Sequence, residues 1–102
     1  MPAYIIVYRE SPVTDPAAIE QYGQMNRANA QMFSTAFGVQ PLAVSGATEG
    51  LEGATPDGVV ILQFPTMDDA RAWYHSPAYQ QAAALRRQAA DWRLVLVEGL
   101  PG

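Results

Sequence analysis

The sequence predicts an α+β fold, in which a four-stranded antiparallel sheet carries its helices on one face in the order β-α-β-β-α(α)-β. Three observations predict this class. Apolar and β-branched runs occupy residues 3–9, 39–45, 59–64 and 92–98. The segments that follow the first and third of these runs repeat apolar residues at helical spacing, and each expected helix begins at a capping residue. The 102 residues are enough for one hydrophobic core, so we expect a single domain over residues 1–102.

The N-terminal third should form a strand followed by a long helix. AYIIVYR at residues 3–9 combines β-branched and aromatic residues and therefore predicts a strand. Asp15 can cap the first helical turn, and Pro16 suits the first helical position. Gly38 is a typical left-handed cap, so we expect the helix to end at about Phe37. The apolar stripe of this helix comprises Ile19, Tyr22, Gly23, Ala30, Phe33 and Phe37.

The middle of the chain should form two strands joined by a loop. VQPLAVS at residues 39–45 is typical of a strand, but Pro41 has no N–H to donate, so this strand should lie at an edge of the sheet. Residues 46–58 are rich in glycine and acidic side chains and predict a solvated loop. VVILQF at residues 59–64 is almost entirely apolar, which favours a central strand.

The C-terminal half should contain two consecutive helices and a last strand. Thr66, with an aspartate three residues later, resembles a capping box and predicts a helix over residues 67–75. Ser76, followed by a proline, predicts the start of a second helix over about residues 77–90. WRLVLVE at residues 92–98 closes the chain as a strand. The complete order is that of a ferredoxin-like fold.

Composition and charge exclude several classes of function. Apolar residues make up 49% and charged residues 16% of the chain, which is typical of a globular protein. The absence of cysteine excludes disulfides, thiolate metal sites and cysteine nucleophiles. A net charge of −4, with six arginines and no lysine, argues against nucleic-acid binding. Without a membrane-spanning run or a signal-peptide pattern, we expect a cytoplasmic protein that does not bind membranes.

Cofactor and metal sites are not indicated either. There is one histidine, and no two carboxylates stand at clear ligand spacing on one helix face, so we expect no metal site. The glycines at 46–58 join two strands rather than a strand and a helix, so they do not form a phosphate-binding loop. We therefore expect chemistry without a cofactor.

The stretch WYHSPAYQ at residues 73–80 holds the only histidine. Histidine is the side-chain type whose ordinary pKa lies near neutral pH, so His75 is a candidate general acid or base. Alternatively, it is an exposed helix-end residue that interacts favourably with the helix dipole. Tyr74 lies about 100° away around the helix, on the apolar stripe, and is a second candidate catalytic residue.

Three polar residues fall on or beside apolar helix stripes. Asn26 lies in the middle of the first stripe, with Asn29 at its border. Asn26 is either a structural amide bonded to backbone or water, or a catalytic group facing a cavity between helix and sheet. Arg86 lies in the stripe of the last helix and either forms an ion pair, with Glu98 as the candidate partner, or binds a ligand carboxylate. The aromatic residues that could contact a ligand beside Arg86 and Asn29 are Tyr8, Tyr22, Trp73 and Tyr79.

The segment ILQFPTMDDARAWYHSPAYQ, residues 61–80, strongly resembles the DUF1330 family of small dimeric α/β-barrel proteins. It contains a strand that ends in Phe-Pro, a short helix with an aromatic pair, and a Ser-Pro step followed by Tyr-Gln. VTDPAAIEQY, LEG at 51–53, the pair Arg86-Arg87 and the closing LVLVEG are also similar to that family, so the resemblance covers nearly the whole chain. It implies a ferredoxin-like protomer whose sheet pairs with a second copy. The apolar strands also favour a homodimer, since helices would cover only one face of the sheet.

Three functions are compatible with these residues. The first is a small cofactor-independent enzyme, of isomerase, lyase, cyclase or oxygenase type, acting on a small apolar or aromatic organic acid or ketone in a pocket between helix and sheet. The second is a dimer that binds such a ligand without turning it over. The third is a dimer with a purely structural or interaction role. A pocket that contains Asn26, Arg86 and a tyrosine hydroxyl favours the first two, and a filled core favours the third.

Overall fold

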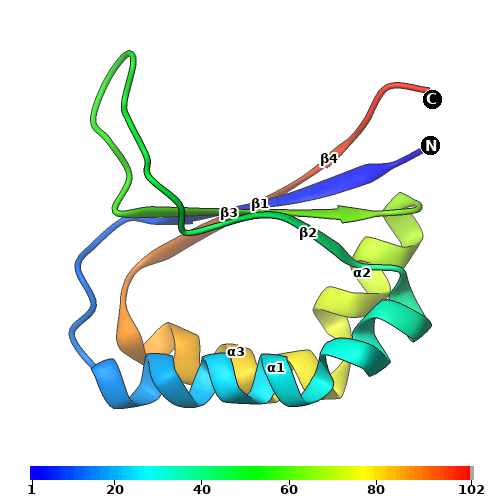
Figure 1. The fold of residues 1–102 in the computed structure, drawn as a ribbon, viewed down its shortest axis with the longest axis horizontal. Helices are drawn as coiled ribbons and strands as arrows, with labels where there is room; N and C mark the ends of the chain where they lie inside the picture. Colours follow the sequence, from blue (N-terminus) through cyan, green and yellow to red (C-terminus); the bar gives the residue numbers. More distant parts are fainter. Residues whose placement is uncertain (102) are drawn as a thin grey trace.

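The computed structural model describes residues 1–101 and has the α+β architecture that the sequence predicts (Figure 1). One antiparallel sheet has the strand order β2-β3-β1-β4, and the helices lie together on one side of it. In chain order the elements are β1 (Ala3–Arg9), α1 (Pro16–Phe37), β2 (Gln40–Val44), β3 (Gly58–Phe64), α2 (Met67–His75), α3 (Pro77–Ala89) and β4 (Trp92–Glu98).

The long helix α1 begins and ends at the expected residues. The Asp15 carboxylate accepts a hydrogen bond from the backbone N–H of Ala18 at 3.1 Å, which satisfies one of the free donors of the first turn. Gly38 has a φ of 66° and donates its N–H to the Ser34 carbonyl at 2.9 Å. A Cβ at Gly38 would lie 2.6 Å from Cγ of Pro65, so this position requires glycine for space as well as for conformation.

The two shorter helices are also capped as expected. The hydroxyl of Thr66 accepts from the Asp69 N–H at 3.1 Å, and the hydroxyl of Ser76 accepts from the Tyr79 N–H at 3.3 Å. Because Ser76 ends α2 and caps α3, the chain changes direction there with no intervening loop. Helix α3 ends at Ala89, one residue before the expected end.

The two faces of the sheet have different environments. Ala3, Ile5 and Val7 of β1 point toward the helices and are buried. The alternate residues form the opposite face, which no helix covers and which we call the open face. Its apolar side chains are partly accessible, with Val95 40% and Val97 44% exposed. The strand register places on the open face Tyr4, Ile6, Tyr8, Val59, Ile61, Gln63, Arg93, Val95 and Val97.

Strand β2 and the loop after it form the outer part of the sheet. As expected, β2 is an edge strand and β3 lies inside, although the pairing of β2 with β3 shifts register between Pro41 and Ala43. The loop over residues 45–57 projects beyond the sheet, on the side away from the helices (Figure 1). Its Leu51 is 87% exposed.

The core lies between the helices and the sheet and is rich in aromatic rings. The Trp73 ring packs on Tyr79 with centroids 3.9 Å apart, on Phe64 at 5.5 Å and on Phe33 at 6.2 Å. Ala30, which we expected on the buried stripe of α1, is exposed, because few residues of this long helix contact the core. Within residues 1–101 we find no helix with the length and apolarity that crossing a bilayer requires.

Candidate functional site

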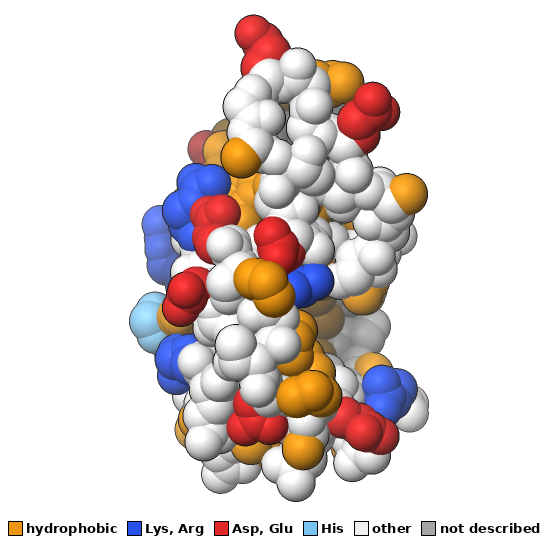
Figure 2. Space-filling view, turned by 90° about the vertical axis from the view of Figure 1, so that its left-hand side faces the viewer, with side chains coloured by type: hydrophobic (Ala, Val, Ile, Leu, Met, Phe, Trp, Pro, Cys, Tyr) orange, Lys and Arg blue, Asp and Glu red, His pale blue; other side chains and the backbone are white. Residues whose placement is uncertain are grey.

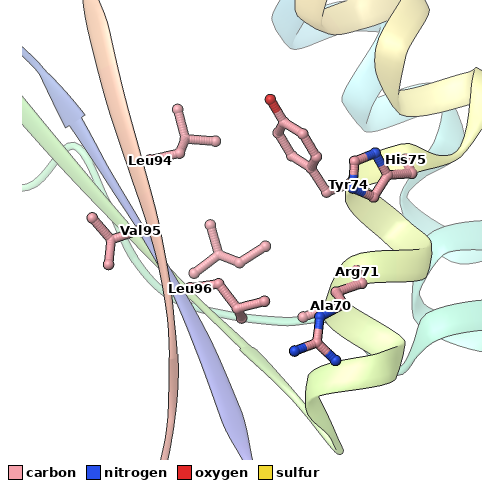
Figure 3. A pocket seen from close by; sticks show the side chains of 8 residues that line it. Ala70, Arg71, Tyr74, His75, Leu94, Val95 and Leu96 are labelled. Carbon is pink, nitrogen blue, oxygen red and sulfur yellow. The ribbon is translucent and has the colours of Figure 1, made fainter.

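A cleft runs between the edge strand β4 and the helices α2 and α3, and it consists of two adjoining hollows. The Arg71 hollow has a volume of about 300 Å³, and the Arg86 hollow has a volume of about 410 Å³. Tyr74 and Leu94 line both hollows, so one ligand could extend through them. The Arg71 hollow (Figure 3) is lined by Ile5, Ala70, Arg71, Tyr74, His75, Leu94, Val95 and Leu96. The Arg86 hollow is lined by Tyr74, Arg86, Arg87, Ala90, Asp91, Trp92 and Leu94.

Tyr74 occupies the middle of the cleft. Its side chain leaves α2 toward β4, and its hydroxyl points into the space beside Leu94 (Figure 3). The ring contacts Tyr79 with centroids 5.9 Å apart, and Gln80 donates a hydrogen bond to the Tyr74 carbonyl at 2.6 Å, which fixes the end of α2. Among the hydrogen bonds of residues 1–101, none involves the Tyr74 hydroxyl. This phenol is therefore free to bind a ligand in a largely apolar hollow.

His75 lies on the rim of the same hollow and is exposed, as the helix-end interpretation expects. Its ring meets the Tyr74 ring edge to face, with centroids 5.1 Å apart and an interplanar angle of 87°. Figure 2 shows the histidine at an edge of the molecule, with arginine side chains above and below it. Two of the three candidate catalytic residues, Tyr74 and His75, are thus adjacent, one inside the cleft and one at its mouth.

Arg86 lines the second hollow and is only 3% exposed. Its guanidinium carbon lies 5.4 Å from the centroid of the Trp92 ring, and Trp92 Nε1 donates to the Arg86 carbonyl at 2.9 Å. The expected ion pair with Glu98 is wrong: Glu98 pairs with Ala3 at one end of β4, whereas Trp92 stands at the other end. Arg86 takes part in none of the ion pairs of residues 1–101, and its buried Nε has no hydrogen-bond partner.

Tyr22 and Tyr79 form a hydrogen-bonded pair deeper in the protein. Their hydroxyls are 3.0 Å apart and their rings meet edge to face with centroids at 6.3 Å. Tyr79 has no exposed surface, and burial raises the pKa of its phenol far above the usual value. The neighbouring Tyr22 adds to this increase in pKa, and the nearby charge of Arg86 partly offsets it. Tyr79 is therefore neutral at physiological pH.

The other predicted site residues lie outside the cleft. Trp73 belongs to the core and Asn26 faces inward from α1, and each has a buried polar atom without a partner, Nε1 and Oδ1 respectively. Asn29 is half-buried on α1 and lines neither hollow. Tyr8 was expected in the pocket between helix and sheet, and that placement is wrong because its ring lies on the open face. There the Arg93 guanidinium covers it, with its carbon 4.4 Å from the ring centroid.

Several lining residues were not identified from the sequence. Trp92, Leu94 and Leu96 alternate along β4 and so share the face toward the helices, a period-two signal that the sequence contains. Arg71 precedes Tyr74 by three positions and therefore lies on the same side of α2. The metal prediction remains an expectation; among residues 1–101, His, Asp and Glu side chains do not gather in a group of three that could hold an ion.

The fold and this lateral cleft define a ferredoxin-like α+β protein with a pocket between an edge strand and its helices. Residues 2–100 match the family described as Domain of unknown function (DUF1330), and the chain belongs to this family. No curated protein matches the chain in sequence.

Solved structures with the same fold support the architecture. RPA0582, a protein of unknown function from Rhodopseudomonas palustris, is 21% identical, with 99% of this chain and 84% of that chain covered and a TM-score of 0.69. A dimeric ferredoxin-like protein of unknown function from Jannaschia sp. CCS1 is 13% identical, with 97% and 100% covered and a TM-score of 0.68. A candidate antibiotic biosynthesis monooxygenase from Nitrosomonas europaea is 16% identical, with 97% and 90% covered and a TM-score of 0.62.

Proposed function

We propose that this protein is a small cofactor-independent enzyme that acts on a small apolar or aromatic organic acid or ketone in the β4 cleft. The observation that carries the proposal is the position of Tyr74, whose unbonded hydroxyl stands between a largely apolar hollow beside Arg71 and a more polar hollow beside Arg86. Such a site contacts an apolar body and offers one oriented hydrogen-bond donor. The interior between the helices and the central strands is filled with aromatic rings, so the proposal rests on the cleft at the edge strand β4.

The reaction types that we consider share one difficult step, the removal of a proton beside a carbonyl group. The base takes the proton, the C–H electron pair forms a C=C bond to the carbonyl carbon, the C=O π pair moves onto the oxygen, and an enolate forms. A phenol that donates a hydrogen bond to this oxygen stabilises the developing charge. Tyr74 is placed for that task, and His75, in contact with its ring at the mouth of the cleft, is the candidate base that accepts the proton and exchanges it with solvent.

A homodimer is the second part of the proposal. The open face carries apolar side chains on three adjacent strands, and the helices leave it uncovered. Several proteins with this fold, including the one from Jannaschia, are described as dimeric. Apart from Val95, which borders the Arg71 hollow, the strand residues that line the cleft are on the helix side of the sheet, so a second copy on the open face would leave the Arg86 hollow accessible.

Replacing Tyr74 with phenylalanine tests the catalytic role. We expect Tyr74→Phe to slow proton exchange at the carbon beside the carbonyl of phenylpyruvate by about 10²–10³-fold, since the loss of one donor to a developing oxyanion costs that much. Proton NMR in D2O measures the exchange above the uncatalysed background, and the melting temperature should not fall because the ring remains. The neutral ketone 4-phenylbutan-2-one provides the parallel substrate without a carboxylate.

His75→Gln distinguishes an enzyme from a binding protein in the same assay. A loss of two orders of magnitude with unchanged stability would assign His75 as the base, whereas a change below about tenfold would leave it as a helix-end residue. If the wild-type protein binds both ketones but accelerates exchange in neither, the enzyme proposal is wrong and the non-catalytic binding function takes its place.

A further inference from the structure

We propose that Arg86 is a carboxylate receptor, so that the ligand of the β4 cleft is an organic acid whose anionic end enters the Arg86 hollow while its apolar body extends past Tyr74. This inference rests on the proposed function only in sharing its cleft. It narrows the ligand class from acids or ketones to acids.

The first reason is that Arg86 is a buried cation without a counter-ion. At 3% exposure it has lost most of its hydration, and among residues 1–101 no carboxylate forms an ion pair with it. A buried charge is normally paired, because the desolvation of an unpaired one costs several kcal/mol. The face of Trp92 compensates only part of that cost.

The second reason is that the surrounding groups cannot supply the missing negative charge. Tyr79, a phenol of the core that is close enough to Arg86 for its pKa to be affected by that charge, stays protonated because burial raises its pKa. At the rim, Arg87 and Asp91 bring one charge of each sign, so they do not neutralise Arg86. Glu98 lies at the far end of β4. The positive charge of Arg86 is therefore paired only when an anion binds in the hollow.

The third reason is shape. Arg86 borders a hollow of about 410 Å³ whose other walls include the Trp92 ring and Leu94. An arginine fork binds a carboxylate through two parallel hydrogen bonds, and its aromatic and aliphatic neighbours suit the adjoining carbon chain. From there, Tyr74 and Leu94 lead into the Arg71 hollow, which can accept the apolar end.

Calorimetric titration with a matched pair of probes tests the inference. 3-Phenylpropionate carries the carboxylate, and 3-phenylpropanamide has nearly the same shape without the charge. We expect the wild-type protein to bind the acid about 10- to 100-fold more tightly than the amide, as loss of a charge-assisted hydrogen-bond pair predicts. In Arg86→Met that preference should disappear, because the acid then binds no better than the amide.

Two further variants separate a specific site from general electrostatics. Arg27→Met, on the exposed side of α1, makes the same change in net charge far from the cleft and should keep the preference for the acid. Arg86→Lys keeps the charge but not the planar fork, and should retain only part of that preference. The Met variant should fold, because replacing a buried unpaired cation with an apolar side chain is often neutral or stabilising. Its melting temperature checks this.

Several outcomes would overturn the inference. The first is that the acid does not bind at millimolar concentration, and the second is that acid and amide bind with equal affinity. The third is that Arg87→Met loses as much affinity for the acid as Arg86→Met does, which would place the anion at the rim.

Failure of the proposed function would give different results. If the acid binds through Arg86 but proton exchange is not accelerated, the carboxylate site is supported and the enzyme proposal is wrong. If 4-phenylbutan-2-one exchanges its proton with the help of Tyr74 and acids bind no better, the enzyme proposal is supported and the carboxylate site is wrong.

Discussion

Replacing Tyr79 with alanine should destabilise the fold by about 3–5 kcal/mol, as the truncation of large buried aromatic side chains does. Tyr79 has no exposed surface and packs on three other aromatic rings, with its centroid 3.9 Å from that of Trp73. A cavity at this point would remove the contacts that those three rings make with Tyr79. A loss of about 3 kcal/mol lowers the melting temperature of a domain of this size by roughly 12 °C or more. It is also a large part of the total stability of such a domain, which is about 5–15 kcal/mol.

Two variants show whether the loss comes from packing at this site. Tyr79→Phe removes only the hydroxyl that bonds Tyr22, and should cost about 1 kcal/mol. Leu51→Ala removes an apolar side chain that is 87% exposed, and should change stability by less than about 0.5 kcal/mol. Urea unfolding measures all three. A Tyr79→Ala loss as small as that of Tyr79→Phe would mean that the aromatic cluster is loosely packed.

Tyr79 should also make the protein sensitive to alkali. The chain has no lysine and no cysteine, so tyrosines are the side chains that titrate between about pH 9 and pH 11. Burial raises the pKa of Tyr79 in the folded state, whereas in the unfolded chain it titrates near pH 10. Its contribution is therefore complete below about pH 10 and is lost above it, because the unfolded chain releases a proton that the folded protein keeps.

The expected slope from Tyr79 alone is up to about 1.4 kcal/mol of unfolding free energy per pH unit above pH 10. Unfolding curves at successive alkaline pH values, for the wild type and for Tyr79→Phe, isolate this contribution. The variant should be less stable at neutral pH and should lose stability more slowly as the pH rises. Parallel pH profiles in the two proteins would contradict the buried, neutral state of this phenol.

The elements of this fold could be predicted because their boundaries depend on neighbouring residues. Asp15, Gly38, Thr66 and Ser76 cap helices through hydrogen bonds to residues three or four positions away, so the sequence alone indicates where each helix starts or stops. The bulge in β2 was missed, because a register shift depends on the partner strand rather than on local propensity.

The site was harder to predict because it depends on contacts between distant residues. Strand β1 is apolar on both sides, with Ala3, Ile5 and Val7 facing the helices and Tyr8 on the other side, so alternation alone could not show which side forms a pocket. The stripe of α3 showed correctly that Arg86 points inward. It could not show that Glu98 would lie at the opposite end of β4, since that follows from the strand register.

A single charge on the open face should convert the protein from a dimer to a monomer. We propose Ile61→Glu, because Ile61 pairs across strands with Ile6 in the middle of that face. In the homodimer this position would be covered by the second sheet, and an unpaired carboxylate buried there costs several kcal/mol. The dissociation constant should rise by more than about 100-fold, which sedimentation equilibrium or light scattering at micromolar concentration can measure.

The matched control is Ala28→Glu, which adds the same charge to an exposed position on α1, on the helical side of the molecule. It should leave the dimer intact. The loop over residues 45–57 gives a second measurement, since it projects on the same side as the open face and its Leu51 should become protected only in the dimer. A wild-type monomer, or equal dissociation in both variants, would show that the open face is not the interface. The apolar side chains of three adjacent strands argue for the opposite result, because a face of this kind on a protein in water is normally covered.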